Sequence, residues 1–519
     1  MQKRDCEALK TICLIGLPLV GWLATLNFFR PAGVGWLQLL PAALKATPTM
    51  PMLWVGLVGG GLLAYFAHKW IDAHCDDGFR GEPYRTFLRG TRMVNWHNLR
   101  NKVLVENKRY NAQLKSKGHK PRLPVFLGEM PMPMIFENRN LLIDGSIGTG
   151  KSVVLETLVG SILRRRDRMI ITDPNGHMLS KFFCSGDVIL NPYDQRSAGW
   201  SIFNEIRSEA DFESLAKSVI PPASSAESEE WCSLARNILA DTMKKQVEIG
   251  KPDVNALVDM LTRADGEVIK TFLTGTDSQG FFRENAERAT ASVQFLLTKY
   301  VRPLRQMTSG EFSLHQWLHN PNARNLFITW REDMKESLKP LVSAWVDIFC
   351  SKFLSLNPSL DRRTWLVIDE LVSLSKLESF VNAATQGRRY GLCIAAGIQD
   401  WAQIDELYGR NGADIIRACF RNYLILGAAN AYNAKRSSEI IGRHDVRRLR
   451  VTHNNSLSKM ADGTHNITHE NEPVITESEI SNLPDLTGYI IFPGELPIAR
   501  MQFKPPSYPV RCEPFKVSR

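Results

Sequence analysis

One segment between residues 141 and 158, LLIDGSIGTGKSVVLETL, strongly limits the folds open to this chain. An apolar run ends at Asp144, a glycine-rich loop follows, and the residues after the loop have helical character. The loop fits the pattern G-x-x-x-x-G-K-[ST] and consists of Gly145, Ser146, Ile147, Gly148, Thr149, Gly150, Lys151 and Ser152. Glycines in such a loop let backbone N–H groups turn inward around phosphate oxygens. The sequence therefore predicts an ATP site, with Lys151 reaching the β and γ phosphates and the Ser152 hydroxyl ligating Mg²⁺.

Two apolar runs precede this loop, and both have the length of a membrane span. Residues 11–29 and 46–67 carry no charge, and 19 residues of helix rise about 28 Å, close to the roughly 30 Å hydrocarbon core. We expect a transmembrane hairpin over 1–70, with spans at about 11–29 and 47–67. A cleaved signal peptide fits less well, because the first run is long, lacks an A-x-A-like site and is followed by a second run.

Lysines and arginines concentrate outside the two runs and not between them, where only Arg30 and Lys45 stand. The positive-inside rule then places both termini and the body of the chain in the cytoplasm. Gly56 and Gly60 form a small-x-x-x-small pair that would pack either against a neighbouring subunit or against the first span. The sequence leaves these two possibilities open.

Charge and cysteine content restrict the partners and the compartment. The net charge of +10 suits an anionic partner such as nucleic acid or anionic lipid, although basic flanks of membrane helices would also account for it. The nine cysteines form no C-x-x-C pair and no zinc-like spacing. His315 and His319 lack an H-E-x-x-H context, so surface or packing roles are favoured. Scattered thiols indicate a reducing, cytoplasmic compartment.

The body of the chain alternates apolar runs with helical patterns, which is typical of a parallel α/β sheet. The expected strands are NLLID (140–144), RMIITDPNG (168–176), NLFITW (325–330), WLVIDE (365–370), LCIAAGIQ (392–399), YLILGA (423–428) and GYIIFPG (488–494). Between the second and third strands, helical periodicity prevails over 211–220, 229–249, 252–273 and 282–307. We therefore expect an all-helical domain at 197–315, inserted into a nucleotide-binding domain formed by 71–196 and 316–519.

WLVIDE supplies the carboxylates that ATP hydrolysis requires. Asp369 and Glu370 end a predicted buried strand, and ligands of open parallel sheets bind at the carboxyl edge of such strands. Asp369 is suited to hold Mg²⁺ through water, and Glu370 to polarise the attacking water. Alone, this pair would be an ordinary strand end; together with a P-loop it predicts a hydrolytic site.

Three further polar side chains are candidates for this site. Gln399 ends a third strand, where its amide would sense the γ-phosphate or satisfy a turn. Arg388 and Arg389 precede that strand; one would reach into a neighbour's site to stabilise transition-state charge, or both form a solvated or phosphate-contacting pair. Arg139, just before the P-loop strand, is a weaker candidate for the same role.

Taken together, these features resemble the type IV secretion coupling proteins of conjugative plasmids, the TraD/TrwB family. The likeness is carried by GEMPMPMIFENRNLLIDGSIGTGKS (128–152), ILNPYDQRSAGWSIFNE (189–205), RRYGLCIAAGIQDWAQIDELYG (388–409) and SNLPDLTGYIIFPG (481–494). The resemblance implies a RecA-like P-loop NTPase domain with an inserted all-α domain, anchored in the bacterial inner membrane as a homo-hexamer. It also implies catalytic roles for Lys151, Glu370, Gln399 as sensor and Arg388 as finger.

The resemblance further implies partners and a reaction. Such a protein recruits relaxase-bound DNA and uses ATP to drive single-stranded DNA into a type IV secretion channel. Relaxosome proteins, channel proteins, and single- and double-stranded DNA are the expected partners. The chain ends soon after its last strand in the basic segment PVRCEPFKVSR, so docking through the acidic tail of some relatives is not expected. The helical domain is then the better docking surface.

Two other functions fit the same motifs. One is a membrane-anchored ATPase or receptor that exports protein substrates, and the other is a nucleotide-gated docking scaffold without turnover.

A basic cluster near the C-terminal end is a candidate DNA contact; it consists of Arg443, Arg447, Arg448 and Arg450. No aromatic platform accompanies this cluster, which slightly favours a subunit interface or a solvated cluster. Residues 451–472 are polar and are expected to form a loop.

Overall fold

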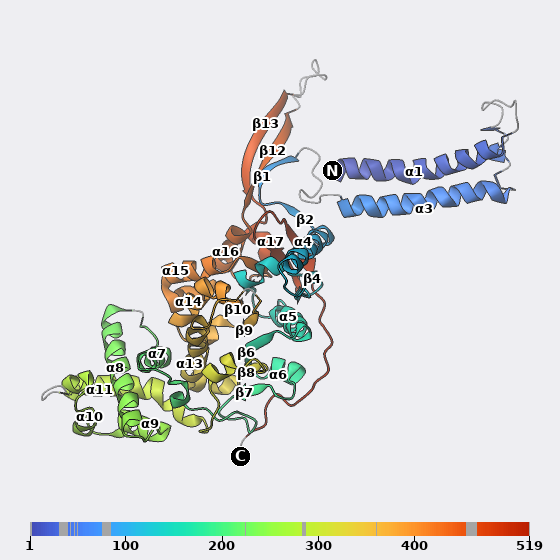
Figure 1. The fold of residues 1–519 in the computed structure, drawn as a ribbon. Coiled ribbons are helices and arrows are strands. Elements are labelled where there is room, and N and C mark those ends of the chain that lie inside the picture. The colour runs from blue at the N-terminus through green and yellow to red at the C-terminus, as the bar shows by residue number, and fades with distance from the viewer. Residues whose placement is uncertain are drawn as a thin grey trace. The chain divides into compact units, whose positions relative to one another are not determined.

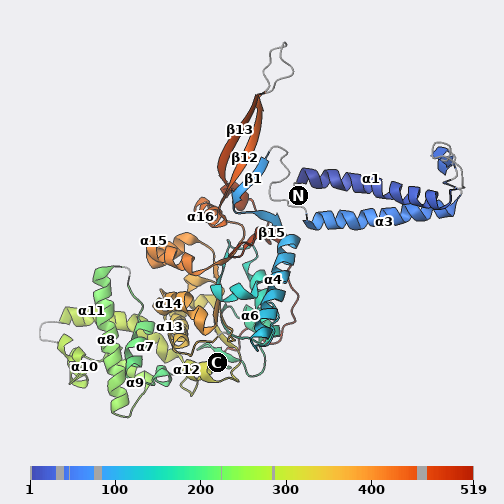
Figure 2. The same cartoon turned by 45° about the horizontal axis from the view of Figure 1, so that its top comes forward.

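The structure is a computed structural model, and it describes residues 3–30, 40–41, 43–45, 47–48, 50–74, 85–223, 225–282, 287–359, 361–452 and 464–517. The chain divides into two compact units (Figures 1 and 2). The first unit comprises Met1–Lys102, Ile441–Ile475 and Pro497–Arg500, and the second comprises Val103–Ile440, Thr476–Leu496 and Met501–Arg519.

The first unit contains an antiparallel pair of apolar helices, α1 (Lys3–Phe28) and α3 (Pro51–His74). Within them, Ala8–Phe28 and Pro51–Ile71 are each 21 residues long and apolar enough to cross a membrane. The two helices approach closely at glycines: a Cβ on Gly56 would lie 2.3 Å from the Gly21 carbonyl oxygen, and one on Gly60 would lie 2.3 Å from that of Leu17. The glycine pair therefore packs against the first apolar helix, which was one of the two possibilities.

The first unit also contains a three-stranded antiparallel sheet of β1 (Arg85–Gly90), β12 (Arg443–Thr452) and β13 (Thr464–Pro473). The expectation of a loop over 451–472 was therefore wrong at 451–452 and 464–472; the rest of that segment lies outside the described residues. Few apolar side chains mark these strands. Backbone pairing and polar cross-strand pairs stabilise them instead, such as Asn471 Nδ2 donating to Asp445 Oδ1 at 2.6 Å. In the same unit, β2 (Met93–Asn95) pairs in parallel with residues 498–500 of β15 (Ile498–Gln502).

A sheet in the second unit forms the core of the molecule's α/β part. Its strands lie in the order β14-β11-β5-β10-β9-β6-β8-β7. Their bounds are β5 (Leu141–Asp144), β6 (Arg168–Pro174), β7 (Val188–Leu190), β8 (Leu326–Trp330), β9 (Thr364–Ile368), β10 (Leu392–Ile398), β11 (Asn422–Ile425) and β14 (Thr487–Ile491). All of these pair in parallel except β14, which runs antiparallel to β11. The predicted α/β sheet is confirmed, with β7 as an additional strand and GYIIFPG as the antiparallel exception.

The strands of this sheet are buried, as in parallel sheets whose faces are covered by helices. The helices of this part of the chain are α4 (Trp96–Ser116), α5 (Lys151–Arg165), α6 (His177–Phe182), α13 (Lys335–Leu354), α14 (Glu378–Gln386), α15 (Trp401–Cys419), α16 (Ala431–Ile441) and α17 (Glu477–Ser481). A short hairpin is formed by β3 (Phe126–Leu127) and β4 (Met130–Pro131). Helix α5 ends where Arg166 turns left-handed, at φ 65°, and donates its N–H to the Ile162 and Leu163 carbonyls.

The interval between β7 and β8 is helical, as its periodicity predicts. It contains α7 (Ala210–Val219), α8 (Ala226–Glu248), α9 (Val254–Arg263), α10 (Gly266–Phe272), α11 (Glu287–Val301) and α12 (Leu314–His319), and α7 to α11 gather in one group (Figures 1 and 2). Buried Glu205 joins the two ends of this interval: it accepts hydrogen bonds from Trp200 Nε1 at 2.9 Å and from the Leu314 N–H at 2.7 Å. The proposed domain limits, 197–315, stay a prediction.

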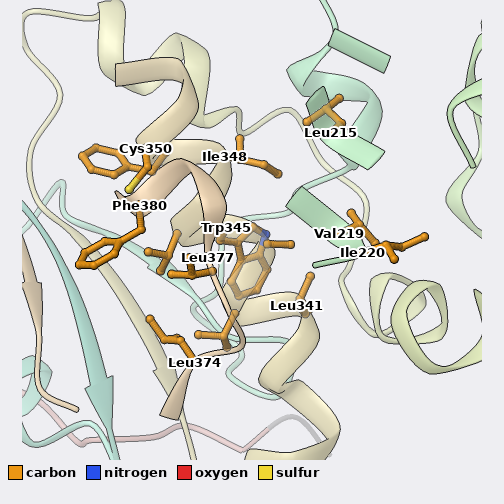
Figure 3. Close-up of a cluster of buried hydrophobic side chains, with 14 of the residues drawn as sticks. Leu215, Val219, Ile220, Leu341, Trp345, Ile348, Cys350, Leu374, Leu377 and Phe380 are labelled. Atoms are coloured by element: carbon orange, nitrogen blue, oxygen red, sulfur yellow. The ribbon is translucent and has the colours of Figure 1, made fainter. Parts of the chain in front are cut away.

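A buried apolar cluster joins the helical group to the α/β part (Figure 3). Leu215, Val219 and Ile220 at the end of α7 face Leu341 and Trp345 of α13, and Leu374, Leu377 and Phe380 pack on the same helix. The last three residues belong to the segment that follows Asp369 and Glu370 in the chain. Helix α7 of the interval and the chain segment that leaves the predicted hydrolytic site thus pack on the same helix, α13.

Candidate nucleotide site

The predicted site residues lie at the carboxyl ends of neighbouring parallel strands. The P-loop follows β5, Gln399 follows β10, and Asp369 and Glu370 follow β9. In the ladder, Asp144 pairs with Ile398 and Ile368 pairs with Ala396. Since β10 lies between β5 and β9, Gln399 stands between the P-loop and the two carboxylates. One edge of the sheet thus brings together residues from three distant parts of the sequence.

The P-loop connects β5 to the start of α5. Gly148 and Gly150 adopt φ values of 84° and 108°, which L side chains rarely adopt. The Ser146 hydroxyl accepts a hydrogen bond from the Ala429 N–H at 2.7 Å, and the Ser146 N–H donates to the Gly427 carbonyl at 3.0 Å. These bonds tie the loop to the segment after β11. The tip remains open, since the Ile147 residue is 83% exposed.

Lys151 begins α5 and is only 8% exposed. Its ammonium Nζ donates to the Gly145 carbonyl oxygen at 2.5 Å, so the side chain lies back over the loop. Burial lowers the pKa of Lys151, and the nearby carboxylates of Glu370, Asp369 and Asp144 oppose this effect. Ser152, the next residue, is exposed. A cation and a hydroxyl thus stand at the helix N-terminus, where phosphates bind.

Glu370 is 8% exposed, and neither of its carboxylate oxygens accepts a hydrogen bond of normal geometry. Burial raises its pKa to about 7; Lys151 opposes the rise and Asp369 adds to it. The backbone and amide of Gln399 lie near enough to lower the pKa of Glu370 slightly. Burial also raises the pKa of Asp369, against the influence of Lys151. A carboxyl that titrates near pH 7 in a buried setting is suited to general-base work.

The backbone beside Asp369 is unusually close to its neighbour. A Cβ on Gly397, in β10, would lie 2.0 Å from the Asp369 carbonyl oxygen. No side chain fits at this position without a shift of the backbone that carries the acidic pair. Gly397 thus allows β10 to hold Gln399 close to Glu370, a requirement that the sequence pattern did not reveal.

Two buried aspartates at the same edge were not predicted as site residues. Asp144, directly before the P-loop, accepts hydrogen bonds from Trp401 Nε1 at 3.0 Å and Ser437 Oγ at 2.7 Å, and burial raises its pKa to about 6. Asp173, in β6, accepts from the Met178 and Leu179 N–H groups, and burial raises its pKa to about 7. Their position at the ends of apolar runs was the only signal in the sequence.

The predicted arginines lie elsewhere. Arg388 belongs to a short 3₁₀ turn, Gly387–Tyr390, that precedes β10, so it stands at the opposite edge of the sheet. The seven residues of β10 span about 23 Å at roughly 3.3 Å per residue. Arg388 is exposed. Burial lowers the pKa of Arg139, and the nearby charges of Arg388 and Arg421 lower it further. The structure therefore does not bring Arg388 or Arg139 to the P-loop of its own chain.

This combination of a parallel sheet, a P-loop at a helix N-terminus and an acidic pair on a neighbouring strand defines the class of P-loop nucleotide-binding α/β proteins. Residues 124–504 match the model of the type IV secretion-system coupling protein DNA-binding domain. The chain belongs to this family of coupling proteins of conjugative transfer, and its sheet has the fold of their solved structures.

Known relatives support the assignment. The coupling protein TraD of Escherichia coli (strain K12) is 27% identical over 412 residues, which cover 77% of this chain. The chain spans 57% of the length of that relative. The unbound bacterial conjugative coupling protein TrwBdeltaN70 is 40% identical, with a TM-score of 0.76, over 85% of this chain and 98% of that one. TrwB in complex with ADP and Mg²⁺ is 40% identical, with a TM-score of 0.74, over 84% of this chain and 99% of that one.

Proposed function

We propose that this protein is an ATP-driven coupling protein of the bacterial inner membrane. It recruits relaxase-bound DNA and drives single-stranded DNA into a type IV secretion channel during conjugation. The observation that carries this proposal is the convergence of Lys151, Asp369, Glu370 and Gln399 at one sheet edge. Membership of the coupling-protein family supports the proposal that the energy of ATP hydrolysis is used for DNA transfer.

The residues at the sheet edge fit ATP and Mg²⁺. The N-terminus of α5 and the open loop tip would receive phosphates, and Lys151 would neutralise their β and γ oxygens. Ser152 and Asp369 would hold Mg²⁺, which neutralises charge that develops on the phosphates. Glu370 would accept the proton of the attacking water, because its free carboxylate titrates near neutral pH. Gln399 would report the loss of the γ-phosphate through its position beside Glu370.

We place the completion of the site at the contact between subunits of a homo-hexamer. Arg388 stands about 23 Å from the P-loop edge of its own chain, as the length of β10 implies. It is exposed and belongs to a group of arginines with Arg139 and Arg421. In a ring, such an edge would meet the nucleotide edge of the next subunit, where an arginine stabilises transition-state charge.

The two apolar helices anchor the protein in this proposal. The concentration of lysine and arginine outside the pair puts both termini and the ATPase body in the cytoplasm. There the body would meet ATP, relaxase-bound DNA and relaxosome proteins. The anchored end would adjoin the channel proteins.

The test is the ATPase rate of the full-length protein in nanodiscs, with and without single-stranded DNA at low salt. We expect DNA to bind and to raise turnover, and Lys151→Ala to abolish turnover. Absence of DNA binding at low salt would sink the proposal, because phosphate contacts dominate there.

Two other outcomes of this assay would each indicate a different function. Stimulation by a secreted or relaxosome protein, but not by DNA, would indicate a protein-export ATPase. Negligible turnover with DNA and partners present, together with intact partner binding in Lys151→Ala, would indicate a docking scaffold.

A further inference from the structure

A cleft of about 1260 Å³ lies inside the second unit, between the helical group and the α/β part. We name it the insert cleft. One wall is formed by α8 and α11, and the other by the first turns of α13, by α15 and by residues 372–376. The nucleotide site described above uses none of its lining residues.

The charged side chains of the insert cleft are mainly cationic. Lys299 stands on the helical wall, and Lys335, Lys339 and Lys376 stand on the other wall. Two glutamates, Glu336 and Glu406, also line it, so four lysines face two carboxylates. Within the described ranges, Lys299 and Lys376 form no ion pair. Lys335 is paired with Glu332 at 2.9 Å. The other ammonium groups, which stand on both sides of the cleft, are complementary to a chain of phosphates.

Aromatic side chains accompany these lysines on the helical wall. Trp231 of α8 and Phe295 and Tyr300 of α11 line the cleft. The Phe295 residue is 75% exposed, so packing in a core does not explain it. Aromatic faces beside a cationic groove are the pattern of proteins that bind single-stranded nucleic acid without sequence preference.

The other wall of the cleft is continuous with the hydrolytic site. Residues 372–376 begin two positions after Glu370, and the Glu370 carbonyl oxygen accepts the Ser373 hydroxyl at 2.7 Å. Lys339 Nζ donates to the Val372 carbonyl at 3.4 Å, and the Ser375 N–H donates to Ser343 Oγ at 2.8 Å. A displacement of residues 372–376 would therefore change the position of Glu370.

We propose that the insert cleft binds a segment of single-stranded nucleic acid, and that its 372–376 wall transmits occupancy to Glu370. The inference rests on the proposed function and deepens it by locating a binding site for the transported strand. An acidic polypeptide fits less well: the described lining contains no arginine, whose planar fork suits carboxylates, whereas lysines beside aromatic faces suit phosphates and bases.

The test compares two double variants of the full-length protein in nanodiscs. Lys299→Ala with Lys376→Ala removes two cleft cations, and Lys217→Ala with Lys251→Ala removes two exposed cations outside the cleft. Fluorescence anisotropy with labelled oligothymidylate gives Kd across a range of salt concentrations. We expect the cleft variant to bind oligothymidylate at least tenfold more weakly than the wild type, and the control variant to bind it as the wild type does. Its salt slope should fall by about 1.4, since each phosphate contact to a single strand contributes about 0.7.

An aromatic pair of variants tests the stacking separately. Phe295→Ala should weaken binding by about tenfold, and Phe281→Ala, a partly exposed phenylalanine outside the cleft lining, should not. In the wild type, photocross-linking with 5-iodouracil oligonucleotides should place adducts on Trp231, Phe295 or Tyr300. This readout does not depend on whether a variant folds.

The possible results separate the two proposals. Equal Kd values and salt slopes for the cleft and control variants, with cross-links elsewhere, would overturn the cleft inference while leaving a DNA-binding motor intact. Loss of polyglutamate binding in the cleft variants, with oligothymidylate binding kept, would overturn it in favour of a polypeptide. A wild type that binds no oligonucleotide at low salt would overturn the proposed function itself, and the inference with it.

Discussion

Replacement of Glu370 by glutamine should stabilise the nucleotide-free protein while it stops hydrolysis. The pKa of Glu370 is about 7, against an ordinary value of 4.5, because the carboxylate is buried without hydrogen-bond donors of normal geometry. The difference is about 2.5, and each pKa unit corresponds to about 1.4 kcal/mol. Ionised Glu370 therefore destabilises the folded state by about 3 kcal/mol above pH 7.

The pH dependence of this effect has a definite sign. The folded protein holds the proton of Glu370 more tightly than the unfolded chain does, so stability is lost as pH rises from 4.5 through 7. A glutamine cannot ionise and avoids this loss. The stability gained by Glu370→Gln should grow from under about 1 kcal/mol at pH 5 to about 3 kcal/mol at pH 8.

Thermal unfolding of the full-length protein without nucleotide, from pH 5 to pH 8, measures this gain. At roughly 1–2 °C per kcal/mol for a cooperative unit of this size, we expect Glu370→Gln to raise Tm by about 3–6 °C at pH 8. Glu230→Gln, at an exposed position of α8, should leave Tm within a degree or so of the wild type. The reasoning is refuted if Glu370→Gln is no more stable at pH 8, or if its advantage is independent of pH.

Four further outcomes follow from the same geometry. The hydrolysis rate should fall about tenfold per pH unit below pH 7 as Glu370 takes up its proton; a flat profile from pH 5.5 to 8.5 would contradict this. Gly397→Ala places a Cβ 2.0 Å from the Asp369 carbonyl oxygen and should weaken Mg-ATP binding at least tenfold in a fluorescent-analogue titration, whereas unchanged affinity would argue against the close approach. Arg388→Ala should keep nucleotide affinity within about twofold but lower kcat by about a thousandfold, and a small kcat effect would remove it as a finger. Asp347→Ala should cost about 2–4 kcal/mol in unfolding, because this buried carboxylate accepts hydrogen bonds from Ser218 of α7 and from Ser379 of α14; a Tm equal to that of the wild type would contradict the link.

Local signals were enough to predict the nucleotide half of the fold. Local patterns identify three of its parts without knowledge of the tertiary structure: the P-loop glycines, the apolar strand before them and the WLVIDE run. The helices between β7 and β8 were also predictable, because their apolar residues recur at three and four positions. The two apolar helices follow from length and absence of charge alone.

What the sequence did not predict depends on contacts between distant segments. The strands β12 and β13 have few apolar residues and are stabilised by their pairing, so a polar sequence was interpreted as a loop. Burial raises the pKa of Asp144, and hydrogen bonds from Ser437 and Trp401, far along the chain, oppose that rise. The separation of Arg388 from its own P-loop required the strand order, and the insert cleft required the packing of α8 and α11 against the chain after Glu370.

The ATPase rate of the full-length protein, measured against protein concentration with and without single-stranded DNA, tests the central claim most directly. The account predicts a steep rise of specific activity with concentration, further stimulation by DNA, and recovery of activity when Lys151→Ala and Arg388→Ala subunits are mixed. A specific activity that is independent of concentration and of DNA, with no recovery on mixing, would contradict it.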